Sequence, residues 1–412
     1  MRISLSTIRE SIVALLLITA TVCCRPMIYG NNYSPIALVI MFVLVLLYLI
    51  PKHFKFGIKG KRNGKTLLAI YLFCIYCLLQ GVILGADQIA IGIGDLLYII
   101  IVVTVFYMWL GNDSVRRKYT ILLYILLIIS AFSYAISLVM SFAVGWKSLY
   151  IKSIDYGYFF RSELYFPFTY TYGRFMFNGI SVRRMLGIAR ECGISQVFYV
   201  WAYFMADKYF RHPLLFKIVM AFGVCACMST AGFIAFGIAL ILSFEIKALF
   251  NWKTVVSAIL IVAMVYVLFY SSGLSLSDKA QLSILDRVDY LFVGLRAWFQ
   301  RPIFGHGYSD TLGYGSGSQV GINAISSLGQ IGTVGFVIWL AVYITNIRYY
   351  KKKKRWIIAN VAYLITALFS QPLMFAPITY WFFFTNYDEE PEYLLKKRRN
   401  LRKTAQGERS AI

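Results

Sequence analysis

Hydrophobic residues gather along this chain into long uninterrupted runs, and most polar residues fall between those runs. Most runs are about as long as a bilayer-spanning α-helix, which needs roughly 17–25 residues. Because the runs are continuous and do not alternate with polar residues, they predict helices and not strands. We expect about twelve spans, at residues 8–24, 35–51, 66–84, 92–110, 119–144, 194–210, 214–229, 232–250, 254–270, 323–347, 356–370 and 373–387. The predicted fold class is all-α, a polytopic membrane helical bundle.

Composition supports this interpretation. The 412 residues are 59% hydrophobic and only 14% charged, which is far less charge than a soluble chain of this length carries. The net charge of +23 is concentrated in short segments between the apolar runs, such as 52–65, 348–355 and the tail at 396–409. Short basic loops face the cytoplasm, so the chain is predicted to be multi-pass with both termini cytoplasmic. The same placement favours the lipid bilayer over nucleic acid as the partner of these charges.

This topology divides the chain into five regions and puts two long loops on the extracytoplasmic side. The regions are the helices of 1–144, the first loop at 145–193, the helices of 194–270, the second loop at 271–322, and the helices and basic tail of 323–412. Long loops of this kind are usually functional. In the second loop, apolar residues recur at helical spacing over 283–300, which predicts an amphipathic helix at the membrane surface.

The predicted spans carry no ionisable residue near their centres, which moves the expected chemistry to the outer loops. Ion-coupled transporters usually need carboxylates or histidines along a path through the bilayer, so this pattern disfavours a transporter. Most of the seven cysteines lie within or beside apolar runs, and no disulfide framework is predicted. The outer loops contain no metal-ligand pattern, so neither a metal nor another cofactor is expected.

Arginines in the outer loops run against the cytoplasmic bias of the other basic residues. The planar guanidinium matches phosphate oxygens in pairs, so an outer cluster would suit a lipid pyrophosphate. The alternative is that several arginines pair with acidic residues of the same loops. The arginines are Arg161, Arg174, Arg183, Arg184, Arg190, Arg287, Arg296 and Arg301, and the acidic residues are Asp155, Glu163, Glu191, Asp286 and Asp289.

Aromatic and titratable residues supply the other candidates. Tyrosines stack on the apolar faces of sugar rings, although they also form belts at membrane interfaces. The candidate glycan-binding residues are Tyr165, Tyr170 and Tyr172. His306, in a glycine turn, is the candidate general base. Glu191 is the alternative base, or a partner that orients Arg184.

Three stretches of the chain together resemble the O-antigen polymerase and ligase superfamily. The segment RMLGIARECG at 184–193 is similar to the family's Arg-x-x-Gly-hydrophobic-x-x-Glu-Pro-Gly/Asn segment, and STAG at 229–232 looks like its Ser-(Arg/Thr)-x-Gly turn. In and after the second loop the resemblance is carried in order by DR at 286–287, RAW at 296–298, PIFGHG at 302–307, Asn323 and GTVG at 332–335. Arg296 and Gly307 also satisfy the R-x10-G spacing of some polymerases. The resemblance covers roughly residues 180–345, and its order and spacing are more specific than any single motif.

The resemblance implies an enzyme of glycan assembly at the outer face of the cytoplasmic (inner) membrane. Polymerases of this family join undecaprenyl-pyrophosphate-linked oligosaccharide repeat units of O-antigen, capsule or exopolysaccharide, often with a chain-length regulator as partner. By carry-over, Arg184 and Arg287 would hold the pyrophosphate, with Arg296 and Arg183 next. Fixed guanidinium groups would stabilise the charge that develops on the leaving pyrophosphate without a metal ion.

Two departures from the family pattern bear on the activity. Cys192 stands where the family has proline, a change that alters the turn before the sixth span. Ligases carry a histidine immediately before the asparagine that opens the late helix, and Ile322 stands there in this chain. The second departure favours a repeat-unit polymerase over an O-antigen ligase that transfers glycan to lipid A-core. A lipid-linked glycan flippase or transporter is the alternative from another class.

Overall fold

The computed structural model describes residues 5–50, 64–155, 161–177, 180–243, 289, 291–312, 323–349, 354–371 and 373–384. Six of its helices are long and apolar enough to cross a membrane. They are α1 (Leu5–Cys23), α2 (Gly30–Leu49), α3 (Gly64–Leu84), α4 (Ile89–Leu110), α5 (Asp113–Leu149) and α11 (Leu328–Tyr349). The prediction of a helical membrane protein is therefore confirmed.

Shorter helices complete the part of the bundle that the structure describes. They are α6 (Cys192–Tyr209), α7 (Pro213–Cys227), α8 (Thr230–Ser243) and α12 (Lys354–Phe369). Together with the six long helices they lie over the predicted spans from 8–24 to 232–250 and over 323–347 and 356–370. The predicted span at 254–270 lies outside the described residues.

The prediction of a final α-helical span at 373–387 is wrong as far as Phe384. The chain there forms two 3₁₀ helices, η3 (Leu373–Phe375) and η4 (Pro377–Phe384). Pro377 cannot donate a backbone hydrogen bond and clashes with the preceding turn, so it interrupts an α-helix at this point. Every residue of η4 is buried, and the element packs against α4. Its Trp381 ring centre also lies 4.9 Å from that of Trp201 in α6. This apolar segment is thus core of the bundle, not a lipid-facing helix.

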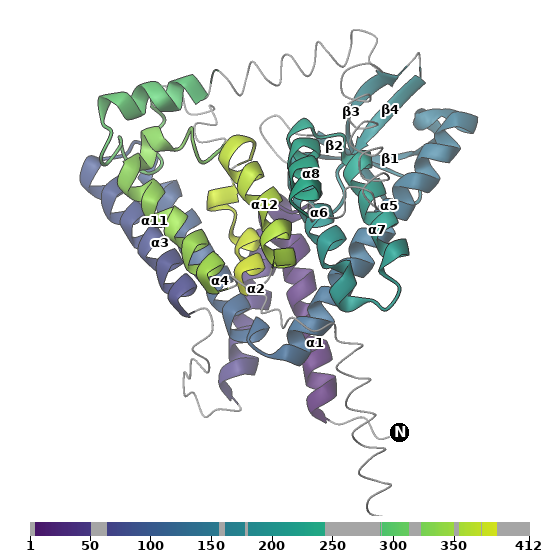
Figure 1. Ribbon diagram of the computed structural model, residues 1–412, viewed down its shortest axis with the longest axis horizontal. Helices are drawn as coiled ribbons and strands as arrows, with labels where there is room; N and C mark the ends of the chain where they lie inside the picture. The colour runs from purple at the N-terminus through teal and green to yellow at the C-terminus, as the bar shows by residue number, and fades with distance from the viewer. Residues whose placement is uncertain are drawn as a thin grey trace, which may run out of the picture.

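The prediction of an all-α fold is wrong in the first outer loop, which forms a four-stranded antiparallel sheet. Its strands are β1 (Tyr150–Asp155), β2 (Arg161–Tyr165), β3 (Thr169–Phe177) and β4 (Ile180–Met185), hydrogen-bonded in that order. The segment is rich in aromatic and β-branched residues, which favour strands. The sheet lies against α5 and α7 (Figure 1), so it buries one face on the helices.

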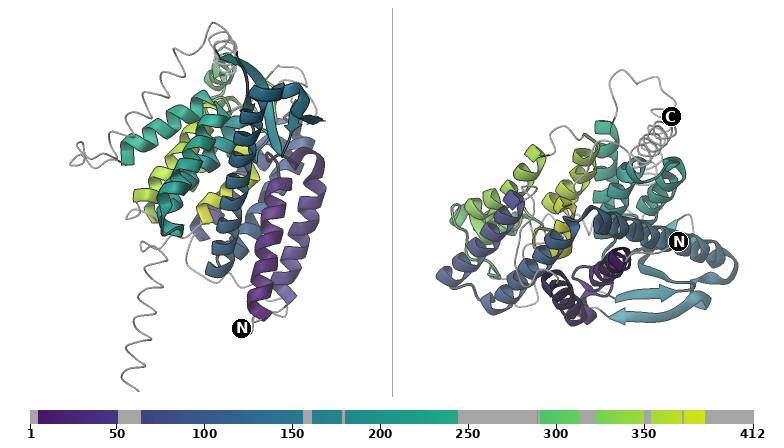
Figure 2. Two further views of the ribbon diagram at one scale, coloured as in Figure 1. Left: turned by 90° about the vertical axis from the view of Figure 1, so that its right-hand side faces the viewer. Right: turned by 90° about the horizontal axis from the view of Figure 1, so that it is seen from below.

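Helix α5 carries the sheet. It continues for 37 residues, well past the predicted 119–144, and bends at Gly145, whose φ of 75° is accessible to glycine. Ser133 and Ser137 on this helix hydrogen-bond to the β2–β3 turn. Figure 2 shows the sheet beside the far part of α5, beyond the ends of α1 and α2. The sheet of the first long loop is therefore attached to a helix that is longer than a bilayer span requires.

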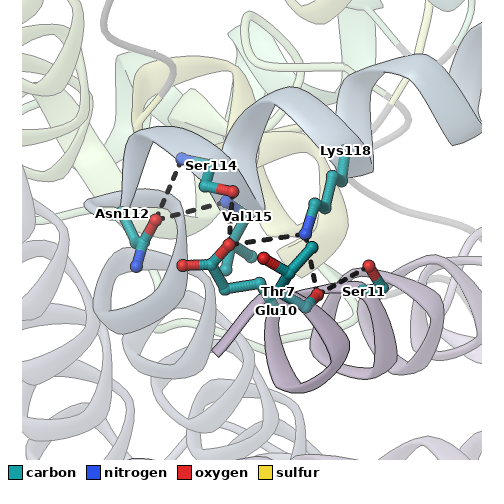
Figure 3. Close-up of polar contacts among 7 residues, drawn as sticks. All are labelled: Thr7, Glu10, Ser11, Asn112, Ser114, Val115 and Lys118. Carbon is teal, nitrogen blue, oxygen red and sulfur yellow. Dashed lines mark hydrogen bonds and ion pairs between the residues drawn. The ribbon is translucent and has the colours of Figure 1, made fainter. Parts of the chain in front are cut away.

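A cluster of polar side chains ties the beginnings of α1 and α5 together (Figure 3). The side chain of Asn112 caps α5 by accepting the backbone N–H groups of Ser114 and Val115 at 2.9 and 3.3 Å. The Glu10 carboxylate accepts the Ser114 hydroxyl at 2.5 Å and pairs with the Lys118 ammonium at 3.4 Å. The two helices therefore start at the same end of the bundle.

The described parts of both long loops lie at the opposite end of the bundle from the start of α1 (Figure 1). The sheet occupies one side of that end, and the described part of the second loop, 291–312, occupies the other. The predicted amphipathic helix at 283–300 is helical at 289 and 291–300, and its remaining residues lie outside the described ranges.

Candidate functional site

The turn from β4 into α6 carries the first motif, at 184–193, and its shape depends on one glycine and one serine. Gly187 has a φ of 68°, and a Cβ there would lie 3.0 Å from the Ser195 hydroxyl oxygen. That hydroxyl accepts the backbone N–H of Ala189 at 2.9 Å and donates to the carbonyl of Leu186. The serine from the first turn of α6 thus closes the loop that precedes it.

The connection between α1 and α2 holds the same turn from the other side. The backbone N–H of Ile28 donates to the Ile188 carbonyl at 3.0 Å, and that of Arg190 donates to the Pro26 carbonyl at 3.1 Å. Met27 forms an isolated bridge with Ala189. The motif therefore has a fixed backbone, as a site that positions charge requires.

Arg184 extends from β4 toward the beginning of α6. It lies opposite Tyr172 of β3 in the sheet register and is half-buried. Its guanidinium lies near Cys192, at the start of α6, and Cys227, at the end of α7. A helix N-terminus presents partial positive charge, which adds to that of the guanidinium. The arrangement is suited to an anion.

Arg183, the preceding residue, is engaged within the sheet. Its guanidinium forms an ion pair with Glu163 of β2 and lies 4.7 Å from the ring centre of Tyr165. The residue is 5% exposed, and burial lowers the pKa of its guanidinium from the usual value. The alternative that outer arginines pair with acidic residues of the same loop is thus confirmed for Arg183.

Glu191 precedes α6 and pairs with its neighbour in the chain. Its carboxylate lies 3.5 Å from Nε of Arg190, and both side chains are about four-fifths buried. Among the described residues, no side chain caps α6 at this position by a hydrogen bond. Of the two candidate bases, Glu191 is therefore the one in the same turn as Arg184.

The three candidate glycan-binding tyrosines lie in different surroundings. Tyr165 is 1% exposed, and its hydroxyl donates to Glu163 at 2.5 Å, so it offers no open face to a sugar in this structure. Tyr170 is half-buried against Tyr29, with ring centres 6.0 Å apart. Tyr172 is half-buried on the strand that pairs with Arg184. Tyr172 thus remains the candidate nearest to that arginine in the sheet.

The first two motifs meet directly, although they are far apart in the chain. A Cβ on Gly193 would lie 3.4 Å from the Ser229 hydroxyl oxygen and 3.0 Å from Nε2 of Gln371. A Cβ on Gly232 would lie 1.6 Å from Oε1 of Gln196. Both glycines are therefore needed for close approach, and they bring the start of α6 against the α7–α8 turn.

The third motif reaches the same place through the end of α12. After Asn323, the backbone N–H of Ala324 donates to the Ala367 carbonyl at 2.8 Å. The side chain of Asn323 accepts the backbone N–H of Ser326 at 2.8 Å and so shapes the entry to α11. Four residues after Ala367, Gln371 lies against Gly193. The segment 366–371 thus connects the entry to α11 with the first two motifs.

The second outer loop is held by Gln80 of α3. The amide nitrogen of Gln80 donates to the carbonyls of Phe304 and Gln330 at 2.6 and 2.7 Å, and its oxygen accepts the backbone N–H of Tyr308 at 2.7 Å. The residue is 6% exposed. The sequence interpretation missed it, although a glutamine in an otherwise apolar span is a signal of a buried polar contact.

His306 lies within the loop that Gln80 holds. Its backbone N–H donates to the Gly329 carbonyl at 2.9 Å, and Nε2 lies 3.1 Å from the Ala297 carbonyl oxygen. Because a carbonyl only accepts, Nε2 is the donor and Nδ1 is the nitrogen left to take a proton. Arg296 is exposed on the adjacent helical segment. Arg287 lies outside the described residues.

The candidate residues therefore form two groups. Arg183, Arg184 and Glu191 belong to the sheet side, whereas Arg296 and His306 belong to the segment 291–312, on the other side of the bundle in Figure 1. Two residues that the sequence interpretation did not single out, Gln80 and Gln371, position these groups. In comparisons with models of protein families and with curated proteins, the chain matches none.

Proposed function

We propose that this protein is a polysaccharide polymerase that joins undecaprenyl-pyrophosphate-linked oligosaccharide repeat units at the outer face of the cytoplasmic membrane. One observation carries the proposal: the first two motif segments meet at Gly193 and Ser229, and Asn323 of the third stretch leads into Ala324, which bonds to the segment 366–371 beside them. Arg184 extends from the adjoining strand toward this junction. A junction built from the segments that resemble the polymerase family supports a role in that family's chemistry.

The proposed chemistry is transfer of a glycan from a lipid pyrophosphate to a sugar hydroxyl. The bond between the anomeric carbon and the phosphate oxygen breaks, and the lipid pyrophosphate leaves with the electron pair. The acceptor hydroxyl oxygen bonds to the anomeric carbon, and its proton passes to a base. Arg184 would stabilise the charge on the leaving pyrophosphate. Because Glu191 lies in the turn that follows Arg184, whereas His306 lies on the other side of the bundle, we favour Glu191 over His306 as the base.

The test replaces Arg184 in cells that lack the chromosomal copy of the gene. Arg184→Ala should leave the protein in the membrane and remove long glycan chains from a chain-length ladder. Arg184→Lys should restore little, because an ammonium does not reproduce the paired contacts of a guanidinium. Lys152→Ala, at an exposed position of β1, is the matched control and should leave the ladder intact.

The same experiment separates the alternatives. An unchanged ladder in Arg184→Ala would overturn the pyrophosphate assignment. Polymer that accumulates on the lipid carrier in the deletion strain would identify a ligase instead. Repeat units trapped on the cytoplasmic leaflet would identify a flippase. Single repeat units already joined to their acceptor support the polymerase.

A further inference from the structure

Among the side chains that the structure describes in the sheet, the most exposed apolar ones lie at the tip of the β2–β3 hairpin. The tip consists of Phe166, Pro167 and Phe168, and the two phenylalanines are 50% and 72% exposed. Exposed aromatic residues at a turn are unusual in water, where turns favour polar residues and glycine. Contact with an apolar environment would therefore stabilise the exposed rings of the tip.

Helix α5 satisfies the backbone of this tip. The N–H of Phe166 donates to the Leu149 carbonyl at 2.9 Å, and the N–H of Phe168 donates to the Ser133 hydroxyl at 3.0 Å. The Ser137 hydroxyl donates to the Phe166 carbonyl at 2.6 Å. Pro167 has no N–H to satisfy. Each donor at the turn is thus bonded within the protein, as a chain segment in contact with hydrocarbon requires.

The position of these serines along α5 sets the level of the tip. No charged residue occurs between Tyr119 and Trp146 of α5, and Lys147 is the next one. The Leu149 carbonyl and the Ser137 hydroxyl both bond to Phe166, so the chain turns back toward the tip after the bend at Gly145. Val139 and Phe142, which lie beyond the serines, are 69% and 60% exposed. The apolar surface of α5 therefore continues past the tip.

We infer that the Phe166–Phe168 turn is a membrane anchor that inserts among the acyl chains of the leaflet on the sheet side. The far ends of the same hairpin carry Arg161 and Arg174 in the sequence, so the hairpin is apolar at its tip and charged where it leads away. Aromatic residues of this kind are favoured at the boundary of hydrocarbon and headgroups. The anchor would hold β4 and Arg184 at the membrane surface. This inference does not depend on the proposed enzymatic activity.

Site-directed labelling tests the anchor. The full-length Phe168→Cys variant carries a bimane fluorophore in phosphatidylcholine vesicles, with either nitroxide-labelled acyl chains or aqueous iodide as quencher. Phe142→Cys on α5 is the lipid reference, and Ser153→Cys, at an exposed position of β1, is the aqueous reference. The unsubstituted protein, in which six of seven cysteines are buried, gives the labelling background.

The label at 168 should be quenched by the nitroxide chains as strongly as the label at 142, and several-fold more strongly than the label at 153. Quenching by iodide at the level of residue 153 would overturn the inference. Protection from both quenchers would also overturn it, because the tip would then be covered by protein, such as a second copy. Phe166→Cys repeats the measurement on the same turn if Phe168→Cys fails to fold.

Discussion

The two long loops differ in what holds their backbones in place. The first is a sheet whose strands bond to one another, and it carries a buried ion pair between Arg183 and Glu163. The described part of the second has no strand, and its backbone is held by side chains from the bundle, Gln80 of α3 and Gln330 and Thr333 of α11 among them. The first loop is thus held by its own strands as well as by α5, whereas the second depends on α3 and α11. The candidate arginines of the two loops also differ in burial: Arg296 of the second loop is exposed, whereas Arg183 of the first is buried.

The largest effect should come from removal of the support of the second loop. Gln80→Leu removes three hydrogen bonds and leaves the backbone N–H of the buried Tyr308 without its partner, so we expect a loss of about 3 kcal/mol of stability. Hydrogen exchange should show lost protection at 304–310 and unchanged protection in the sheet. Gln300→Ala, at an exposed position near the same loop, is the control. Equal loss of protection in both loops would contradict the difference described above.

A smaller effect should follow from removal of the carboxylate in the sheet. Glu163→Gln leaves the buried Arg183 charge uncompensated, which costs about 3–5 kcal/mol for a fully buried pair. Because the Glu163 side chain is 35% exposed, solvent screening reduces the expected loss to about 2 kcal/mol. Thermal unfolding in detergent measures it. Asp95→Asn, which breaks the exposed pair with Arg25, should cost less than about 1 kcal/mol.

The junction beneath the sheet should respond to a single methyl group. Gly232→Ala would place a Cβ 1.6 Å from the buried Gln196 side chain, so overpacking should cost about 1–2 kcal/mol and displace the α7–α8 turn. Gly237→Ala in the same helix meets nothing within 4 Å and should be neutral or slightly stabilising. Unfolding midpoints of the two variants compare them directly. A neutral Gly232→Ala would show that the junction is looser than the structure indicates.

The smallest effect should come from the exposed arginine of the second loop. Arg296→Ala should change the free energy of unfolding by less than about 0.5 kcal/mol, because surface substitutions rarely do more. In the chain-length assay it should also retain more polymer than Arg184→Ala. If Arg296→Ala abolished polymer as completely as Arg184→Ala, the two long loops would have to contribute to the same functional site.

The sequence predicted most helices because a bilayer demands long apolar runs, and these are visible without a structure. It failed where tertiary packing, and not the local residues alone, determines the secondary structure. The run at 373–387 is apolar enough for a span, but Pro377 and burial against α4 make it a 3₁₀ core element. The sheet had a signal in the alternating threonines and tyrosines at 169–172, directly after Phe166-Pro167-Phe168, which is typical of a strand that follows a turn.

The candidate site was predictable in part. The motif at 184–193 drew attention to Arg183, Arg184 and Glu191, which lie in or beside one turn. The partner of Arg183 was open, because the pairing with Glu163 depends on the registers of three strands. Gln371 could not be found at all from its neighbours in the chain, since its place against Gly193 arises only from tertiary packing.

The strand order of the sheet has a consequence for synthesis of the protein. Each strand pairs with its neighbour in the chain, so the sheet contains only local connections and can form early, while later helices are still being made. The junction at Gly193 needs Ser229 and then Gln371, which leaves the ribosome long after the sheet. A chain interrupted before residue 371 would display a finished sheet over an incomplete junction. Completion of the candidate site is therefore tied to completion of the chain.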